Sequence, residues 1–331
     1  MLKHIIYFSL VFIVLLSSCG SYDTDNVIDE KDLPDISIEV NRYGKAIFEL
    51  DTNNLSQGLK AIKPNFYFFL DANLDDENNV RQIQDFITDT SLIAIFKKSL
   101  EVYPDNSFLN NELTSAFKYY NYYFPQYQLP EVYTYISGMQ YENPIWIQDT
   151  VMVIALDVYL GSDFGPYTGL GLPKYKIKCM RPENLVVDVM KYFYHQDLSV
   201  RIAQRTLLDR MIAGGKMLYY LDRVLPMTAD SVKICYTEKQ IKWAIKNERN
   251  VWAFIIENDL LYSTDYQSQT KLIKDGPFTT GLSRQSPARL GIWLGWQIVN
   301  DYMKNNPETT LQELFQLSDS QLLLHNSRYK P

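Results

Sequence analysis

The sequence predicts an α+β fold, in which a small antiparallel or mixed sheet precedes a mainly helical C-terminal half. Two observations support this class. Three runs of β-branched and aromatic residues, 132–136, 145–147 and 151–159, lie close together in the first half of the chain. From Pro182 onward, apolar residues at helical spacing and helix-start signals dominate.

The first 18 residues predict a signal peptide. Lys3 gives a positive start, an apolar run extends from Ile5 to Leu16, and small residues precede Cys19. The apolar run of about a dozen residues is shorter than the roughly 20 that a helix needs to cross a bilayer core. We therefore expect residues 1–18 to be removed on export.

The end of this leader, Leu16-Ser17-Ser18-Cys19, resembles the bacterial lipobox. The resemblance implies that Cys19 carries acyl chains such as palmitate and becomes the first residue of the mature protein. Two or more chains anchor a protein durably, whereas one chain alone binds marginally. The alternative is a chance cysteine at the end of an ordinary signal peptide. We expect Cys19 to attach the protein to a membrane.

The residues after Cys19 predict a tether and then one domain. Residues 20–35 are acidic and polar and lack periodicity, which is typical of a flexible segment, so 19–35 is expected to be a lipidated tether. No Gly-, Ser- or Pro-rich linker and no internal repeat interrupts residues 36–331. These residues are expected to form a single domain.

The charge of the chain argues against nucleic acid as a partner. The formal net charge is −7, and removal of Lys3 with the leader brings it to −8. Phosphate backbones are bound by clustered Lys and Arg side chains, and the sequence shows no basic stripe.

The elements of the first half follow from periodicity. Residues 36–50 alternate in stretches, which fits a strand pair or a strand that leads into a helix. Apolar residues at helical spacing between Ile83 and Leu100 predict helices, and 106–124 predicts another helix that ends at Pro125. The three β-rich runs are bounded by Gly138, Asn143-Pro144 and Gly161, and we expect adjacent strands.

The second half contains several helix-start signals. A helix is expected over 206–224, and Thr237 with Gln240 forms a capping-box pattern. Ser286-Pro287 predicts a further start, with Ser as the cap and Pro in the first turn. Gly291 and Gly295 then allow close approach of a neighbouring helix. The patterns at 310–313 and 318–321 open two last short helices.

Two cysteines remain after processing, Cys179 and Cys235. An oxidising periplasm permits a disulfide between them. Their distance in sequence and the lack of Cys-x-x-Cys spacing also fit two small buried apolar residues, which is the preferred interpretation.

The sequence offers little evidence of metal or cofactor chemistry. The mature chain has two histidines, His195 and His325, and they belong to no His-x-x-x-His or His-Glu-x-x-His pattern. No P-loop, Gly-x-Gly-x-x-Gly or Gly-x-Ser-x-Gly motif occurs. We expect no metal and no cofactor.

Carboxylates and tyrosines remain as candidate functional groups. Asp157 and Asp163 flank the Gly161 turn and could act as an acid and a base, although aspartates at strand ends are commonly turn residues. Tyrosine occurs 25 times in 331 residues, with a cluster at 119–123. Such clusters suit protein or glycan contacts, and they equally suit a core between helices and a sheet.

Ordered motifs across the mature chain resemble the GldB lipoproteins of Bacteroidota. The resemblance is carried by Val40-Asn-Arg-Tyr43, Asp157-Val-Tyr-Leu-Gly161, residues 206–222, 236–243 and 248–262, Gly276-Pro-Phe-Thr-Thr-Gly281, residues 286–296 and the terminal Ser327-Arg-Tyr-Lys-Pro331. It implies a cell-envelope lipoprotein associated with the machinery that moves surface adhesins in gliding, with other envelope proteins as partners. Related proteins also occur in Bacteroidota that do not glide.

A second set of motifs is similar to zincin-like peptidases. It comprises Asp157-x-x-Leu-Gly161, the helix 184–191, Thr206-Leu-Leu208 and Pro287-x-Arg-x-Gly291. The similarity implies a degenerate peptidase fold, a pseudo-peptidase, because the helix lacks both histidines and the glutamate position falls on a glycine. Zinc needs three protein ligands. The implied vestigial cleft, for a peptide or partner, comprises Asp188, Lys191, Gly214, Gly215 and Arg289.

We therefore expect a non-enzymatic scaffold or binding component, lipid-anchored in the cell envelope. The outer membrane is the expected location, with the body on its periplasmic face or on the cell surface. Two alternatives remain. One is an envelope hydrolase that uses Asp157, Asp163 or Asp188, and the other is a glycan- or peptide-binding lipoprotein that uses the tyrosine clusters.

Overall fold

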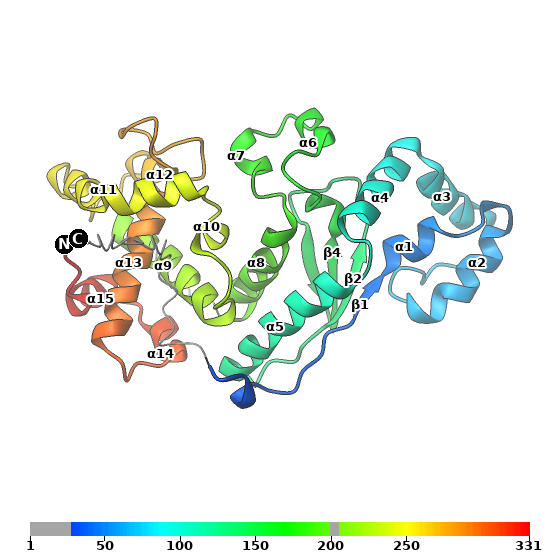
Figure 1. The fold of residues 1–331 in the computed structure, drawn as a ribbon, viewed down its shortest axis with the longest axis horizontal. Coiled ribbons are helices and arrows are strands. Elements are labelled where there is room, and N and C mark those ends of the chain that lie inside the picture. The colour runs from blue at the N-terminus through cyan, green and yellow to red at the C-terminus, as the bar shows by residue number, and fades with distance from the viewer. Residues whose placement is uncertain (1–27, 199–204) are drawn as a thin grey trace, which may run out of the picture.

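The computed structural model describes residues 28–198 and 205–331 (Figure 1). The predicted signal peptide and Cys19 lie outside the described residues. The molecule is elongated, with a small helical group at one end, a sheet in the middle and a larger helical group at the other end (Figure 1). The predicted α+β class, with helices dominating the C-terminal half, is confirmed.

The sheet is mixed and has the order β1-β2-β4-β3. Its strands are β1 (Val40–Arg42), β2 (Glu131–Tyr135), β3 (Ile145–Gln148) and β4 (Val151–Ala155). β1, β2 and β4 are parallel, and β3 pairs antiparallel with β4. The prediction of adjacent strands is confirmed, but the run that was expected to reach Tyr159 leaves the sheet at Ala155 and continues as a 3-10 turn, Leu156–Val158.

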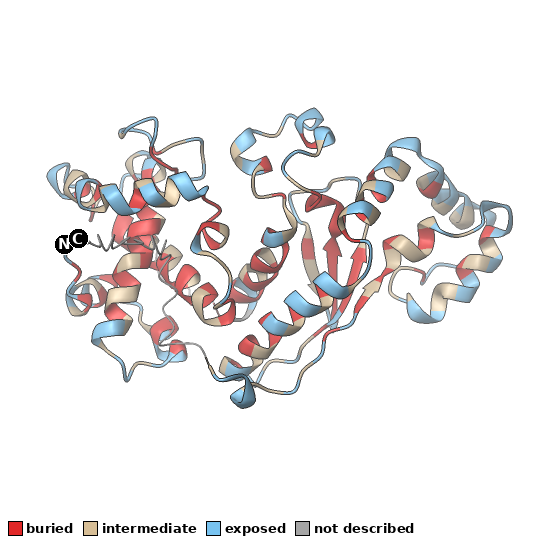
Figure 2. Ribbon diagram, in the orientation of Figure 1, coloured by how far each residue is buried: buried red, intermediate tan, exposed pale blue. Residues whose placement is uncertain are grey.

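Helices and aromatic residues cover the two faces of the sheet. Val132, Met152 and Ile154 face the main core, where the strands of Figure 2 are coloured as buried. The alternate residues Tyr133 and Val153 pack on the other face against the aromatic segment 66–69. Because side chains alternate along a strand, both faces of this sheet are apolar and covered.

Of the five N-terminal helices, the first three form a small core of their own beside the sheet, around Ile47, Leu59 and Ile87, whereas the fourth and fifth pack into the main core. The five helices are α1 (Tyr43–Phe48), α2 (Leu55–Ile62), α3 (Glu77–Thr88), α4 (Thr90–Val102) and α5 (Ser107–Tyr123), with 3-10 turns at Glu30–Asp32, Thr52–Asn54 and Lys63–Asn65. β1 leads directly into α1, which settles the two alternatives for residues 36–50. The carboxylates of Asp76 and Asp89 accept hydrogen bonds from the first turns of α3 and α4 and cap them.

The segment before β1 lies along α5. The Ile38 N–H donates to Thr114 Oγ1 at 2.9 Å, and the Val40 N–H donates to Asn110 Oδ1 at 3.0 Å. The Asn106 amide donates back to the Val40 carbonyl at 2.9 Å. Polar side chains of α5 and its N-cap thus bond the backbone N–H and C=O groups on the outer edge of β1. Without them, the edge strand of the sheet would leave these groups unpaired.

The remaining helices follow the predicted start signals in most places. They are α6 (Gly165–Gly169), α7 (Lys174–Ile177), α8 (Pro182–Phe193) with a π turn at Tyr194–Leu198, α9 (Leu207–Val224), α10 (Asp230–Lys233), α11 (Glu238–Glu257), α12 (Tyr266–Ile273), α13 (Leu290–Asn305), α14 (Leu311–Gln316) and α15 (Ser320–Ser327). Capping boxes open α9, α11 and α14. Asp319 caps α15, one residue after the predicted Ser318.

Close packing of α9 on α13 depends on two glycines. A Cβ atom on Gly295 would overlap the Met211 carbonyl, and one on Gly215 would overlap the Gly295 carbonyl. The predicted close approach of a helix to the Gly291–Gly295 face is therefore confirmed, and α9 is the main partner.

The predicted helix start at Ser286-Pro287 is wrong. α13 begins at Leu290, after Arg289 in the left-handed region with φ 59°. Thr279 explains the difference, because its hydroxyl and its N–H both donate to the Pro287 carbonyl, at 2.7 and 3.1 Å. That carbonyl holds a neighbouring loop and does not start a helix.

The preference for two unpaired cysteines is also wrong. Cys179 and Cys235 form a disulfide, with their Cα atoms 5.9 Å apart. The bond joins the end of α7 to the connection between α10 and α11. The Asn184 side chain supports the same contact, since its amide donates to the Val232 carbonyl at 3.1 Å.

Candidate functional site

The carboxyl edge of the parallel strands is a candidate position for a site. In open sheets with parallel strands, ligands bind outside the carboxyl ends of the strands. β1, β2 and β4 end at the same edge because they are parallel. Tyr43 follows β1, Ile136 follows β2 and Leu156 follows β4.

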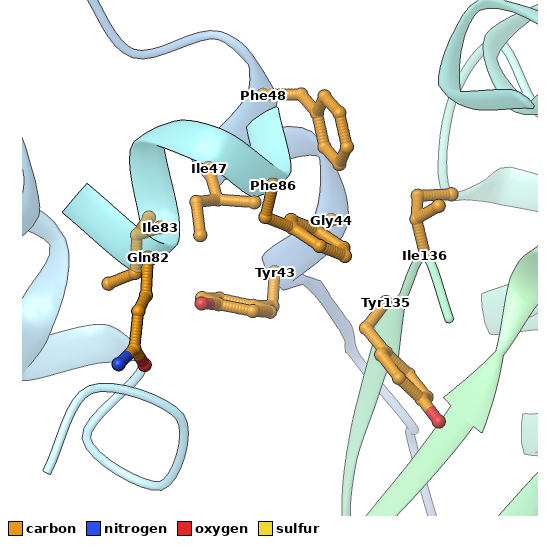
Figure 3. A pocket seen from close by; sticks show the side chains of 9 residues that line it. All are labelled: Tyr43, Gly44, Ile47, Phe48, Gln82, Ile83, Phe86, Tyr135 and Ile136. Carbon is orange, nitrogen blue, oxygen red and sulfur yellow. The ribbon is translucent and has the colours of Figure 1, made fainter. Parts of the chain in front are cut away.

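A pocket of about 220 Å³ opens beside this edge. Figure 3 shows α1 and α3 on one side and the end of β2 on the other. It is lined by Tyr43, Gly44, Ile47, Phe48, Gln82, Ile83, Phe86, Tyr135 and Ile136. Apart from Gln82 and the two tyrosine hydroxyls, the lining side chains are apolar, so the pocket suits contact with an apolar group.

Gly44 and Tyr43 shape this pocket. A Cβ atom on Gly44 would lie 3.2 Å from the Ile136 nitrogen, so glycine lets α1 approach the end of β2. The Tyr43 ring stacks on Phe69, with ring centroids 4.0 Å apart. Burial raises the pKa of the Tyr43 hydroxyl, which therefore stays protonated at neutral pH.

Asp157 lies at the same edge, where it holds a turn. Its fully buried carboxylate accepts hydrogen bonds from the Ser137 N–H at 2.9 Å, from the Ser137 hydroxyl at 3.0 Å and from the Met139 N–H at 2.6 Å. Burial raises the pKa of Asp157, and these donors act against the rise. Asp163 is exposed, across the Gly161 turn. The geometry of Asp157 fits the turn interpretation.

Asp188 and Lys191 are brought together. The Lys191 ammonium lies 3.0 Å from one Asp188 oxygen, and the Tyr159 hydroxyl donates to the other at 3.2 Å. Tyr159 is buried, and its carbonyl accepts from the Tyr103 hydroxyl at 2.8 Å. The Arg42 guanidinium donates to the Tyr103 carbonyl at 2.7 Å. This chain of contacts links α8 to β1.

The other residues of the predicted vestigial cleft lie along the interface of α9 and α13. A Cβ atom on Gly214 would overlap the Ile292 side chain, and Gly215 faces the backbone of α13. Arg289 precedes α13, and its guanidinium donates to the Ile234 carbonyl. The structure does not bring these residues to the pocket at the sheet edge, whose lining contains none of them.

Metal ligands do not gather in the part of the chain that the structure describes: among these residues no group of three or more His, Cys, Asp or Glu could hold an ion. His325 is exposed on α15. Burial and the charge of Lys191 lower the pKa of His195, which lies in the π turn after α8.

The tyrosine cluster on α5 divides between core and surface. Tyr119 and Tyr120 are buried, and Tyr120 packs edge-to-face on Phe117. Tyr122 points outward with 43% of its surface exposed. The core interpretation holds for the first two residues, while Tyr122 offers an aromatic surface.

These features define a helix-rich α+β protein with an apolar pocket beside a small mixed sheet. Over residues 28–198 and 205–331, no helix is long and apolar enough to cross a membrane. The sequence profile of the family described as gliding motility protein GldB matches residues 24–331, and the chain belongs to this family. Membership indicates a gliding-motility-related lipoprotein with a cell-envelope location. No curated protein and no solved structure matches the chain. The similarity to zincin-like peptidases stays a prediction.

Proposed function

We propose that this protein is a non-catalytic binding component of a cell-envelope assembly, held at the outer membrane by the lipid on Cys19. The pocket beside the sheet edge carries the proposal. Its lining is apolar and aromatic, and none of its nine lining residues is a carboxylate, histidine, lysine or cysteine. The ionisable groups in this lining are the hydroxyls of Tyr43 and Tyr135, and burial raises the pKa of both, so neither is poised to exchange a proton at neutral pH. A surface of this kind suits recognition of an apolar group.

The size of the pocket indicates what it would hold. Small-molecule sites commonly occupy roughly 300–1,000 Å³, whereas this pocket measures about 220 Å³. A pocket of this size and lining fits an apolar or aromatic anchor side chain of a partner protein, the kind of residue that dominates binding energy at interfaces. The proposed occupant is therefore such a side chain from another envelope protein.

Adjacent positions on α3 allow a matched test. Ile83 lines the pocket, and Gln84 is exposed outside it. In a strain that lacks the protein, Ile83→Glu should fail to reverse the defect caused by the deletion, although it accumulates to wild-type level. Gln84→Glu, which adds the same charge, should reverse the defect. Full function of Ile83→Glu would contradict the proposal.

The hydrolase alternative makes the opposite prediction for carboxylates. Under the binding proposal, Asp163→Asn and Asp188→Asn proteins should both reverse the defect caused by the deletion, because neither carboxylate lines the pocket. Asp157→Asn serves as the third variant, with its folding checked by circular dichroism. Loss of function in a fully folded aspartate variant would favour catalysis.

The anchor is tested separately. Cys19→Ser should leave the body soluble and abolish function, because the proposal requires a fixed position at the membrane. Fractionation of the envelope tests the outer-membrane location, and protease treatment of intact cells reports whether the body faces outward. A soluble Cys19→Ser protein with full function would contradict the role of the lipid.

A further inference from the structure

Three cationic side chains gather around the disulfide, far in sequence from the pocket on α1 and α3. Lys178, Arg181 and Arg289 are all partly buried. The Lys178 ammonium lies 5.8 Å from the centre of the Tyr236 ring, and the Tyr236 hydroxyl contacts the carbonyl of Ala288, next to Arg289, so the two segments meet at this ring. Burial and the positive charges of Arg289 and Arg181 lower the pKa of Lys178. Like charges brought together in a half-buried position destabilise a fold unless an anion joins them.

The position of the two arginines strengthens this point. Arg181 is the N-cap of α8 and Arg289 is the N-cap of α13, and neither side chain caps its helix. Helix N-termini carry a partial positive charge and favour acidic side chains. An arginine at this position therefore increases the local positive charge. Arg181 and Arg289 therefore stand at the N-termini of α8 and α13, where backbone N–H groups already favour an anion.

The surroundings hold the cluster in place. The Lys178 ammonium donates to Gln240 Oε1 at 3.2 Å and lies 5.8 Å from the centre of the buried Tyr236 ring. The Tyr236 hydroxyl donates to the carbonyl of Ala288, directly before Arg289. The disulfide Cys179–Cys235 ties the residue after Lys178 to the residue before Tyr236. The cations are therefore positioned before any ligand arrives.

Negative charge at the cluster is incomplete. Asp275 lies 3.7 Å from Arg289 Nε and is the carboxylate whose charge acts on Lys178. Arg289 Nε is buried and has no hydrogen-bond partner, and the Arg181 guanidinium donates to the neutral Asn184 amide oxygen. Among the ion pairs of the described residues, Asp275 with Arg289 is the one that involves this cluster, so its positive charge is only partly balanced and a phosphate would complete the balance.

We propose that Lys178, Arg181 and Arg289 bind the phosphate group of an envelope molecule. Arginine and lysine recognise phosphate through charge-assisted hydrogen bonds, and the planar guanidinium adds directional donors. Inorganic phosphate, a phosphorylated sugar and a phosphorylated lipid headgroup share this chemistry. The site lies away from the proposed partner pocket and does not depend on it.

The test is calorimetric titration of the full-length protein in detergent with inorganic phosphate, at constant ionic strength. We expect saturable binding that Lys178→Gln and Arg181→Gln each weaken at least tenfold. Lys176→Gln, on an exposed position of α7, is the matched control and should bind as the wild type does. Arg289 is left unchanged because its guanidinium also holds the Ile234 carbonyl. Thermal melting followed by circular dichroism confirms that each variant is folded.

Further titrations separate the sources of phosphate. A sugar phosphate and vesicles of phosphatidylcholine with or without phosphatidic acid show which carrier of phosphate binds more tightly than the free ion. Absence of saturable phosphate binding would overturn the proposal. So would equal weakening by Lys176→Gln, or acetate binding as tightly as phosphate, since the first indicates nonspecific attraction and the second a carboxylate site.

Discussion

Lys216 offers a quantitative test of the electrostatics of this fold. The side chain lies on α9 with 1% of its surface exposed, and its ammonium donates to the Leu317 carbonyl. Burial lowers the pKa of Lys216 to about 8 from an ordinary 10.5. Replacement by methionine keeps the length of the side chain and removes its charge.

The magnitude follows from linkage between protonation and folding. The fall in the pKa of Lys216 from 10.5 to about 8 corresponds to about 3 kcal/mol of unfolding free energy, at about 1.4 kcal/mol per pKa unit. Below pH 8 Lys216 is protonated in both the folded protein and the unfolded chain, so the full cost of burying its charge lowers the stability of the fold. Between pH 8 and 10.5 the unfolded chain binds more protons than the folded protein, and stability rises with pH.

The wild type should therefore gain about 3 kcal/mol relative to Lys216→Met between pH 7 and 10.5. Urea denaturation followed by circular dichroism at several pH values measures this difference, with equal m-values required for comparison. At pH 7 the variant should be the more stable protein, by less than 3 kcal/mol because about 1 kcal/mol of hydrogen bonding to Leu317 is lost. A difference between the two proteins that stays constant with pH would refute the reasoning.

Three further predictions concern stability. Cys179→Ser should lower the unfolding free energy by about 4 kcal/mol, since the disulfide spans 56 residues, and urea denaturation with and without reductant checks it. Gly295→Ala should cost more than about 2 kcal/mol by forcing α9 from α13, whereas Gly169→Ala, with open space around it, should cost little; comparison of melting temperatures distinguishes them. Asp157→Ala should cost about 2 kcal/mol because it leaves the half-buried Met139 N–H without its acceptor, and an unchanged denaturation midpoint would contradict that role.

Local signals predicted much of this fold. The capping box of Thr237 and Gln240 opens α11 because its hydrogen bonds involve residues only three apart. The β-branched runs predicted the strands for the same reason, since alternation along a strand reports burial of its own faces. The close packing at Gly295 was predictable because a glycine on an apolar helix face lets the backbone of a neighbouring helix come into contact there.

Contacts between distant segments decided the rest. The Thr279 hydroxyl donates to the Pro287 carbonyl, which therefore accepts from a neighbouring loop and not from the next turn of a helix. The sequence pattern Ser286-Pro287 gave no sign of this contact. The disulfide depends on how α10 lies against α8, which neither cysteine reveals by spacing. The pocket is assembled from α1, α3 and the end of β2, and the apolar stripe of α3, which includes Ile83 and Phe86, indicated a buried face but not what covers it.

The cations of the disulfide region escaped prediction for the same reason. Lys178 and Arg181 are close in sequence, but Arg289 joins them only through the contacts of Tyr236 with Ala288 and of its own guanidinium with Ile234. The similarity to zincin-like peptidases had associated Arg289 with Asp188 and Lys191. Its described contacts are with Ile234 and Asp275.

The way the chain enters the body has a mechanical consequence. If the N-terminus is held by a membrane while the body is pulled, the load passes through the hydrogen bonds of Ile38 and Val40 to α5 at the start of β1. These bonds cross the strand direction, so tension along the chain loads them in shear, together with the parallel pairing of β1 with β2. Shear loading breaks several bonds at once instead of one after another, which makes this entry segment a strain-resistant coupling between anchor and body.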